Sequence, residues 1–592
     1  MITGKTNLTL KSSLVAAGIA GFSLLSAQAV KHPNVILIIT DDQGYGDLGI
    51  NGNPHVKTPV LDNLARQSTR FNNFYVCPVS APTRSGLMTG RYFLRTGVRD
   101  TYNGGAMMAP SEVTIAEMLR EAGYATGIFG KWHLGDNYPM RPCDQGFDES
   151  VIHLTGGMGQ PGDITTYLRG DSSYFDPVLW HNGQQEKYDG YCSDIFAGEA
   201  MRFIESAQKQ PFFCYLAFNA PHTPLQVPDK YYQIYKDIDP STGFENDTRP
   251  FQIMSERDKE DARKVYAMVT NIDDNVGLLL KKLDDMGIAE NTIVIFMTDN
   301  GPQQRRYNAG MRGLKGSVYR GGVRVPFYIK YPAIGATSKD VEAVAAYIDA
   351  MPTIAGICNV KMPADRKIDG VNLLPLIKGE KNDAGDRALF FSWTRHNPEL
   401  YNNMALLKGE YKIVGQTDYN AAPDSFELFD IEHDPFEQDN IIQAHPEKAI
   451  DLKNEIDKIF MELTGSSNMI NPPYIEVGTP FEDPVILNRN DAGGERGVWE
   501  QEEVYGKWSL NIREGYYNIK YRFLKPLPAK GRMMLDARSV TYQFFNSDDN
   551  AIFLEMKNVY LPGMKSDFIP FYDTGSRRIL PLWVEIEKVK TD

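Results

Sequence analysis

Two hydrophobic patterns alternate through the first part of the chain. Continuous apolar runs rich in β-branched residues, typical of strands buried on both faces, occupy residues 34–40, 212–218 and 292–298. Between them, apolar residues recur at helical spacing over residues 114–122 and 266–286, and a glycine follows each stretch. Strands that alternate with helices predict an α/β domain whose mixed sheet is covered by helices on both faces.

The pattern changes near residue 386. Short strand-like pieces at 411–414 and 427–430 precede a helical pattern at 446–463, which predicts a small α+β C-terminal subdomain. We therefore place the α/β domain at residues 30–385 and the subdomain at 386–465.

A third type of pattern fills the end of the chain. Gly, Pro, Ser and Asn in residues 466–484 indicate a linker. Beyond it, strand patterns recur with no helical pattern between them, at residues 508–512, 516–523, 551–556 and 582–589. They predict an appended all-β, sandwich-like module over residues 485–592.

The N-terminus resembles an export signal. Lys5 and Lys11 form a basic start, residues 14–25 are apolar or small, and Ala27-Gln28-Ala29 fits a signal-peptidase site. The alternative is a membrane anchor, but the apolar run is shorter than the about 20 residues that cross a hydrocarbon core. No later stretch has that length either, so we predict a signal peptide over residues 1–29, no membrane span and an exported, periplasmic protein.

Composition narrows the possible classes of protein. The 592 residues are 42% hydrophobic, enough for more than one buried core. The formal net charge of −14 argues against a nucleic-acid partner, which needs a basic footprint. Five cysteines without a CxxC pair exclude a scaffold built on disulfides.

Acidic residues follow two of the predicted buried strands. Asp41-Asp42 comes after residues 34–40, and Asp299-Asn300 after residues 292–298. Polar sites of α/β sheets lie at the carboxyl ends of strands, and these oxygen ligands suit Ca²⁺, or Mg²⁺, rather than zinc. The alternative is that both pairs only make turns. The nine His include no HxxxH pair, which disfavours a two-zinc phosphatase site.

The segment Ser80-Ala-Pro-Thr-Arg84 offers a nucleophile. A hydroxyl nucleophile needs a rigid turn to aim it and a nearby cation to hold its oxygen, and Pro82 and Arg84 supply both. The alternative is a Ser/Pro turn that caps a helix. Taken by itself, this pattern does not decide between the two.

These segments together resemble the type I, formylglycine-dependent sulfatases. In that family Cys or Ser is followed by x-Pro-x-Arg and then by Thr-Gly-Arg, as from Ser80 to Arg91 here. Other family segments match in order and spacing: Asp41-Asp42-Gln43-Gly44, Gly130-Lys131-Trp132-His133, Ala220-Pro221-His222-Thr223, Thr298-Asp299-Asn300-Gly301 and Arg312-Gly313-Leu314-Lys315. The resemblance covers about residues 34–463. Arg320 departs from it, because the family often has Glu before Gly321-Gly322.

The resemblance implies an alkaline-phosphatase-like fold and a set of roles. A maturation enzyme oxidises Ser80 to formylglycine, one hydroxyl of its hydrate attacks sulfur, and the aldehyde reforms as inorganic sulfate leaves. Arg84 holds the hydrate, and Lys131 and Lys315 hold sulfate oxygens. We assign His222 as general acid and His133 as base, and these two roles are interchangeable at this stage. The implied metal ligands are Asp41, Asp42, Asp299, Asn300 and the modified Ser80.

The resemblance also suggests a sulfated sugar as substrate, from a glycosaminoglycan, a mucin or an algal polysaccharide. Candidates for specificity are Arg99, Asp171, Arg395 and His396, of which the first two fit solvated surface charges better. Trp499, Trp508 and Tyr516 either stack on sugars or, the reading we favour, are core aromatics. Two other functions stay open: a phosphodiesterase or phosphonate monoester hydrolase, and a non-catalytic sugar-binding protein if Ser80 is unmodified.

Overall fold

The computed structural model describes residue 1 and residues 32–590, apart from 245–246, 381–386, 529 and 539. The predicted signal peptide and its cleavage site after Ala29 lie outside these residues. None of the helices in the described part of the chain combines the length and the apolar character that crossing a membrane requires.

A ten-stranded mixed sheet forms the centre of the α/β domain. β1 (Asn34–Thr40) lies between β9 (Thr292–Thr298) and β8 (Phe212–Ala217), parallel to both, and β4 (Ala125–Lys131) follows β8. All three predicted buried strands are therefore confirmed. The outer strands are β2 (Thr69–Phe71), β5 (Glu149–His153), β6 (Val178–His181), β7 (Gln184–Lys187), β10 (Phe327–Lys330) and β11 (Lys339–Val341).

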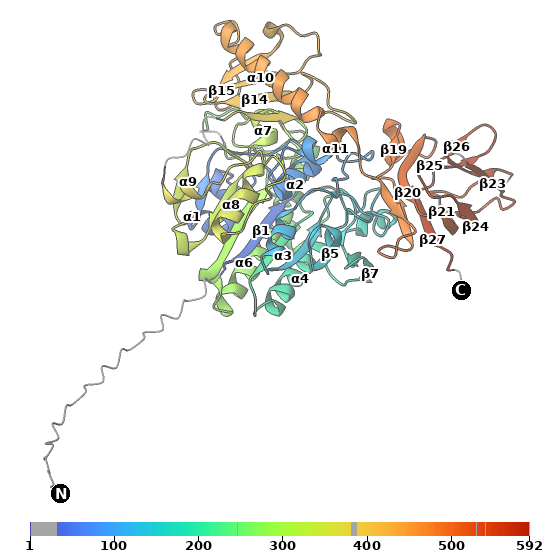
Figure 1. Ribbon diagram of the computed structural model, residues 1–592. Helices are drawn as coiled ribbons and strands as arrows, with labels where there is room; N and C mark the ends of the chain where they lie inside the picture. The colour runs from blue at the N-terminus through green and yellow to red at the C-terminus, as the bar shows by residue number, and fades with distance from the viewer. Residues whose placement is uncertain (2–31, 245–246, 381–386, 529, 539, 591–592) are drawn as a thin grey trace. The chain divides into compact units, whose positions relative to one another are not determined.

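Helices cover both faces of this sheet (Figure 1). Alternate residues of β1 enter two cores, with Leu37 on one face and Ile38 on the other, as expected for a strand buried on both sides. The Leu37 core is shared with α2 (Ser80–Thr89), α3 (Ile115–Glu121) and α8 (Ala350–Cys358). The Ile38 core is shared with α1 (Pro59–Arg66), α4 (Cys192–Ser206) and α6 (Glu256–Asp285).

The helix predicted from residue 266 begins earlier. Ser255 caps α6 through a capping box with Asp258, which satisfies free amides of the first turn. The first ten residues of α6 are mostly charged, so the apolar periodicity only starts near Tyr266. Capping chemistry rather than hydrophobic spacing sets this boundary.

The predicted α+β subdomain is present. Four antiparallel strands, β13 (Leu389–Ser392), β14 (Met404–Lys408), β15 (Tyr411–Gly415) and β16 (Glu427–Asp430), pack against α10 (Pro446–Thr464). Leu452 and Ile456 of α10 are buried with Leu406 of β14 in the same core as α2 and α3. The subdomain is thus continuous with the main domain.

The C-terminal module consists of two sheets around one core, as predicted for a sandwich. One sheet contains β17 (Ile475–Val477), β20 (Gly506–Ile512), β22 (Arg532–Ala537), β23 (Val540–Phe545) and β25 (Met564–Asp573). The other contains β18 (Val485–Asn488), β21 (Gly515–Arg522), β24 (Phe553–Leu561) and β27 (Trp583–Lys588).

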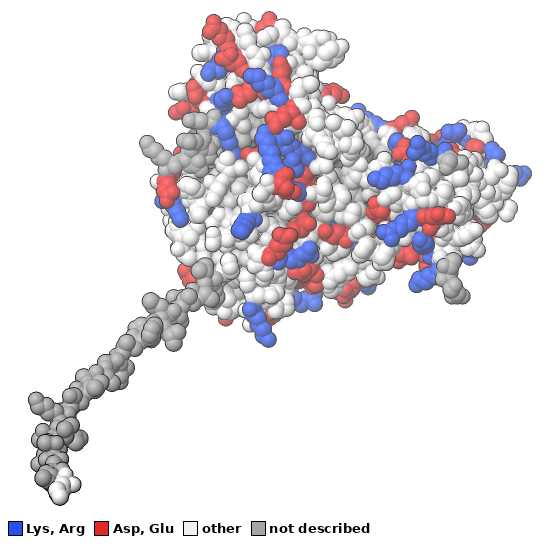
Figure 2. Space-filling view, viewed as in Figure 1, with Lys and Arg blue, Asp and Glu red and all other residues white. Residues whose placement is uncertain are grey.

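The stretch predicted as a linker is partly structured. It contains α11 (Ser467–Ile470), and β17 pairs in parallel with β20 of the module. Met107 and Met140 of the α/β domain enter the core of the module, so the two parts share an apolar interface. On the face seen in Figure 2, acidic and basic side chains are interspersed. The domain boundaries themselves stay predictions.

Candidate active site

The candidate residues meet where the central strands end. Asp41 and Asp42 follow β1, Asp299 follows β9 and Lys131 ends β4, and all four side chains are fully buried. A pocket of about 440 Å³ opens above them. Its lining includes five residues predicted from the sequence: Ser80, Lys131, His133, His222 and Lys315.

Three cations contact three buried carboxylates. Lys131 Nζ donates to Asp41 Oδ2. Lys315 Nζ lies 2.7 Å from Asp42 Oδ1, which also accepts from Asn300 Nδ2 at 2.8 Å. Arg84 Nη2 lies 2.9 Å from Asp299 Oδ2 and 3.7 Å from Asp41 Oδ2. Buried charges of this kind require such pairing, because each leaves water at a cost of several kcal/mol.

The carboxylates differ in how readily they ionise. Burial and the neighbouring Asp299 raise the pKa of Asp41 to about 8. Burial opposes ionisation of Asp42 as well, but Lys315 and His222 outweigh it and lower the pKa of Asp42. A divalent cation beside Asp41 would favour its charged form, because an adjacent opposite charge offsets burial.

The donor set fits such a cation. Asp41 Oδ1 and Asn300 Oδ1 are buried acceptors with no hydrogen-bond partner in the part of the chain that the structure describes. Ligand atoms of Asp41, Asp42 and His222 lie within 4.8 Å of one another. Carboxylate and amide oxygens are the ligands that Ca²⁺ and Mg²⁺ prefer, so the oxygens of Asp41, Asp42, Asp299 and Asn300 suit a hard ion.

Ser80 is the first residue of α2, where backbone amides favour negative charge. Its Oγ donates to Asp299 Oδ2 at 2.6 Å and accepts from Arg84 Nε at 3.3 Å. Gly86 allows α2 to pack here, because a Cβ at this position would lie 2.2 Å from the Tyr347 ring. Both the Ser/Pro helix start and the nucleophile arrangement are therefore present at the same residue.

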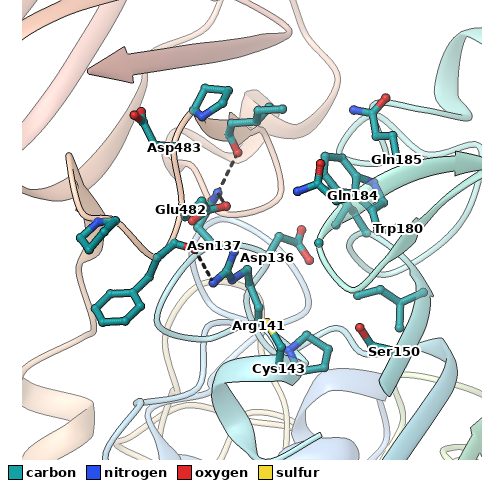
Figure 3. Close-up of a pocket in the computed structure, with 18 residues that line it drawn as sticks. Asp136, Asn137, Arg141, Cys143, Ser150, Trp180, Gln184, Gln185, Glu482 and Asp483 are labelled. Atoms are coloured by element: carbon teal, nitrogen blue, oxygen red, sulfur yellow. Dashed lines mark hydrogen bonds between the residues drawn. The ribbon is translucent and has the colours of Figure 1, made fainter. Parts of the chain in front are cut away.

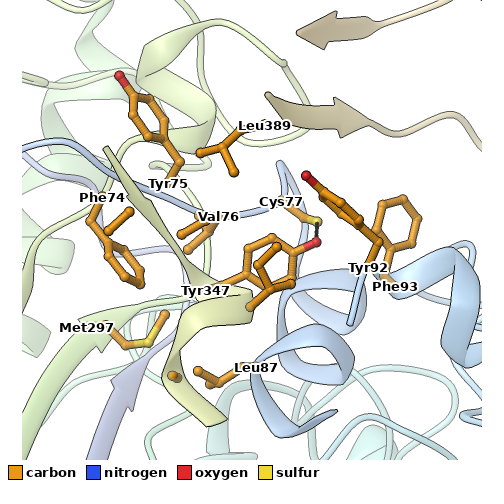
Figure 4. Packing of buried hydrophobic residues seen from close by; sticks show 14 of the residues in the cluster. Phe74, Tyr75, Val76, Cys77, Leu87, Tyr92, Phe93, Met297, Tyr347 and Leu389 are labelled. Carbon is orange, nitrogen blue, oxygen red and sulfur yellow. Dashed lines mark hydrogen bonds between the residues drawn. The ribbon is translucent and has the colours of Figure 1, made fainter. Parts of the chain in front are cut away.

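Cys77 lies three residues before Ser80 but is fully buried in the hydrophobic core (Figure 4). Its thiol donates to the Tyr347 hydroxyl at 3.1 Å. Burial raises the pKa of Cys77 to about 12, which leaves no thiolate at neutral pH. None of the five cysteines, all of which lie in the described residues, forms a disulfide.

His133 has a defined tautomer. Its Nε2 lies 2.7 Å from the carbonyl oxygen of Thr101, and since a carbonyl only accepts, Nε2 carries the proton. Burial and Lys131 lower the pKa of His133 well below its usual value, so the ring is neutral. Nδ1 is then a buried lone pair without a partner among the described residues. The left-handed φ of 62° at His133 marks backbone strain at this site.

His222 is neutral as well. Its Nδ1 donates to the carbonyl oxygen of Thr223 at 2.7 Å, and its Nε2 lies 3.7 Å from Asp42 Oδ2. Burial and Lys315 lower the pKa of His222 to about 3. Both histidines therefore present one free ring nitrogen toward the site.

Only one of the four specificity candidates lines the pocket. Arg395 does so, in an ion pair of 3.1 Å with Asp100. Arg99 and His396 are not among the lining residues, and His396 Nδ1 contacts the Asn103 side chain instead. Asp171 is exposed in a separate shallow hollow.

Several residues that line the pocket are not predicted from the sequence, because they come from loops without a motif. They are Thr101, Tyr102, Gln160, Gln303, Asn490 and Arg496. Trp499 also lines the pocket, so the preference for a core role was wrong for this residue. It was right for Trp508, which is fully buried. Tyr516 is 50% exposed on β21, away from the core.

Two arginines outside the pocket have structural contacts. Arg306 pairs with the buried Asp47 at 2.7 Å and donates to the backbone oxygen of Asp42 at 2.8 Å, which fixes the loop that follows β1. Arg320 donates to the Pro435 oxygen and to Asn73, and it does not line the pocket. The departure from the family pattern therefore leaves the site unaltered.

Comparisons with known proteins agree with this geometry. The sulfatase family profile matches residues 33–360, and the profile "N-sulphoglucosamine sulphohydrolase, C-terminal" matches residues 314–463. N-acetylgalactosamine-6-sulfatase of Mus musculus is 31% identical over 425 residues, 67% of this chain and 74% of that protein. The ulvan-active sulfatase of Formosa agariphila is 32% identical over 448 residues, 72% of this chain and 80% of that protein.

Solved structures agree as well. The crystal structure of Ps i-CgsB in complex with k-i-k-neocarrahexaose is similar with a TM-score of 0.63 at 30% identity, over 74% of this chain and 94% of that one. The family profile alone spans more than half of the chain, from the first strand to the end of α8. The chain therefore belongs to the sulfatase family and is a sulfuric ester hydrolase.

Proposed function

We propose that the chain hydrolyses O-sulfate esters of sugars at Ser80 after this residue has been oxidised to formylglycine. The observation that carries the proposal is the position of Ser80 Oγ, 2.6 Å from Asp299 and 3.3 Å from Arg84 Nε, in a pocket that also contains Lys131 and Lys315. A sulfate ester needs its oxygens neutralised and a nucleophile in line with the bond. The Ser80 hydroxyl and the cations of this one pocket support the proposal, because they supply groups for both requirements.

The charged residues have separate tasks in this proposal. Arg84 holds the oxygen on residue 80, and Lys131 and Lys315 turn from their carboxylates toward the sulfate oxygens. Asp41, Asp42, Asp299 and Asn300 hold a divalent cation, Ca²⁺ in our assignment, which polarises the nucleophile and the sulfate when bound. The aldehyde on residue 80 supplies a hydrate whose second hydroxyl lets the sulfate leave, whereas an unmodified serine would remain as a stable sulfate ester.

The two histidines move protons. The free lone pair at His133 Nδ1 suits a base, which supports assigning His133 to the removal of a proton as sulfate is released. His222 then protonates the leaving sugar oxygen through Nε2. The negative charge of a bound sulfate favours protonation of this nitrogen.

The substrate class follows from relatives rather than from the pocket. Two relatives at 31% and 32% identity are named for N-acetylgalactosamine 6-sulfate and for ulvan, both sulfated carbohydrates. We therefore propose a sulfated sugar from a glycosaminoglycan, mucin or algal polysaccharide. Export to the periplasm and activation by a formylglycine-generating enzyme are part of the same proposal.

Paired esters of one alcohol test the reaction. Protein matured in its host is assayed on 4-nitrophenyl sulfate and 4-nitrophenyl phosphate, with Ser80→Ala as the control. We expect the sulfate ester to be preferred by at least about a hundredfold in kcat/KM and to be lost in the control. A preference for the phosphate ester would instead support the phosphonate or phosphodiester hydrolase alternative.

A further inference from the structure

We infer that the C-terminal β-module completes the active site and binds a second anionic group of the sulfated saccharide through Arg496, with Trp499 against the sugar ring. This inference rests on the proposed function, since it names the substrate of the same site. Three residues of the module, Asn490, Arg496 and Trp499, line the pocket that contains Ser80. They belong to the segment between β18 and β20, in a part of the chain that the sulfatase profiles do not match.

This segment rests on the loop that orients His133. Gly104 N donates to the Asn490 oxygen at 3.1 Å, and the Tyr102 hydroxyl donates to the Arg496 oxygen at 3.2 Å. The rings of Tyr102 and Trp499 lie 5.8 Å apart. Since Thr101 of the same loop accepts from His133, the module contacts the catalytic centre through one short peptide.

The base of the segment is anchored firmly. Arg489 is fully buried and donates to the backbone oxygens of Leu580, Pro581 and Gln501. Asn488 donates to Asp136 Oδ2 of the α/β domain at 2.8 Å. A rigid base places the pocket residues before substrate binds, which lowers the entropic cost of binding.

Further contacts hold the module beside the α/β domain (Figure 3). Arg141 donates to the Phe481 oxygen at 3.1 Å, and Asn137 donates to the Ile486 oxygen at 3.0 Å. Glu482 accepts from the Tyr138 amide at 2.7 Å. The pocket residues of the module are therefore fixed from two sides.

The arginines that line this side of the active-site pocket suit an anionic sugar. Arg395 stacks at 4.7 Å on the Trp393 ring and pairs with Asp100, so its charge is already balanced. Arg496 is exposed, its guanidinium forms no ion pair among the described residues, and its polar side-chain neighbour is the neutral Tyr102 hydroxyl. An unpaired guanidinium at the rim of a pocket is a ready partner for carboxylate or sulfate.

Trp499 provides a second observation that points to a ligand in this pocket. Its Nε1 is buried and has no hydrogen-bond partner within the described ranges. A tryptophan in the wall of a pocket offers an apolar ring to the apolar face of a sugar, and its free Nε1 offers a donor to a sugar hydroxyl. A uronate carboxylate and a second sulfate both satisfy Arg496, and the experiment separates them.

The test compares saccharides that differ only beside the scissile sulfate. Three disaccharides carry the same scissile sulfate beside a neutral neighbour, a uronate neighbour or a neighbour that bears a second sulfate. For Arg496→Gln we expect kcat/KM on the anionic disaccharides, relative to the neutral one, to fall about tenfold to a hundredfold, the effect of one charged hydrogen bond. The anionic disaccharide whose relative kcat/KM falls in Arg496→Gln identifies the group that Arg496 binds.

Matched controls come from the same module. Arg578 is exposed on β26 (Arg578–Ile579), and Tyr516 is half-exposed on β21. Arg578→Gln and Tyr516→Ala should leave every ratio unchanged, whereas Trp499→Ala should raise KM for all three disaccharides. Equal losses on neutral and anionic disaccharides in Arg496→Gln, or no loss on either, would overturn the inference.

A direct binding measurement tests the proposed subsite independently of the proposed reaction. Calorimetric titration of the same disaccharides into Ser80→Ala, with and without Arg496→Gln, reports the subsite without turnover. Binding to Ser80→Ala that depends on Arg496, together with no sulfate release by the natural protein matured in its host, would retain the subsite and reject the proposed reaction. Binding independent of Arg496 would reject the subsite whatever the reaction.

Discussion

Ser80 is well placed but chemically incomplete as encoded. Its hydroxyl is held by Asp299 and Arg84, yet a serine that accepted sulfate would be left esterified. We predict that the peptide containing Ser80, from protein made in its host, is lighter by two hydrogen atoms than the encoded sequence. Mass spectrometry after carbonyl labelling reads this out. Only the encoded mass in fully active protein would contradict the prediction.

His133 is predicted to act on protons rather than on the fold. Replacement by Ala removes the free Nδ1 and should lower kcat by about a hundredfold to ten-thousandfold, the usual contribution of a general base or acid. The exposed His445 serves as the control position. The measurement is kcat on 4-nitrophenyl sulfate together with the melting curve. A loss of kcat that follows a loss of folded protein would not support a proton-transfer role.

The sequence predicts individual site residues where they follow a buried strand or belong to a recognisable motif. Asp41, Asp299 and Ser80 carry such signals, and they meet in the structure. Arg496 and Trp499 carry none, because their role depends on a contact between segments almost 400 residues apart, as from Tyr102 to Arg496. Asp171 and His396 are both predicted as specificity residues, and neither lines the pocket.

β4 delivers Lys131 to the site through a glycine with no room for a side chain. Gly130 has a φ of 117°, and a Cβ there would lie 1.8 Å from the Ala217 oxygen of β8. Gly130→Ala should therefore disrupt β4 and abolish activity, with a cost of several kcal/mol in stability. Gly123→Ala is the matched control, because Gly123 also has a positive φ, 88°, but no atom within 4 Å. Equal effects on the two melting curves would contradict the argument from close contact.

The interface between the module and the α/β domain contains two neighbouring buried acids, Asp136 and Asp491. The Asp136 amide donates to Asp491 Oδ2 at 3.1 Å, and burial raises the pKa of Asp491. A carboxyl whose folded pKa is raised adds stability at low pH and loses it as pH rises through that pKa. Asp491→Asn should therefore raise the melting temperature above neutral pH by a few degrees and change it little below about pH 4, the pKa of an unfolded Asp. A larger gain at the lower pH would contradict this sign.

Elements were predicted best where burial dictates the residue type. β1 and β9 have the predicted bounds, because a strand buried on both faces leaves little choice of side chain and polar residues end it. The start of α6 was missed because a charged, capped turn has no apolar repeat. β17 was missed because three residues in a Pro- and Gly-rich segment carry too little pattern to distinguish a strand from a linker.

The charge of the whole molecule describes its surface rather than its site. The chain has a formal charge of −14, whereas the pocket contains Lys131, Lys315, Arg395 and Arg496. Local positive charge governs how an anionic ester is held. The acidic total argues against a nucleic-acid partner but does not exclude a sulfated one.

Metal binding should stabilise the folded molecule. After chelation, Ca²⁺ at about a hundred times its dissociation constant should add about 2.7 kcal/mol of stability, since the ion binds only the folded site. Differential scanning calorimetry with and without Ca²⁺ measures this shift, and Asp42→Asn should reduce it. A shift of the same size in the variant would place the stabilising ion elsewhere.

The central claim is hydrolysis of a sugar sulfate at Ser80. The most direct measurement is inorganic sulfate released from a sulfated oligosaccharide by protein matured in its host, compared with Ser80→Ala. We predict sulfate release with multiple turnovers by the natural chain, and no release by Ser80→Ala when that variant is folded equally well. Release at the same rate by Ser80→Ala would contradict it.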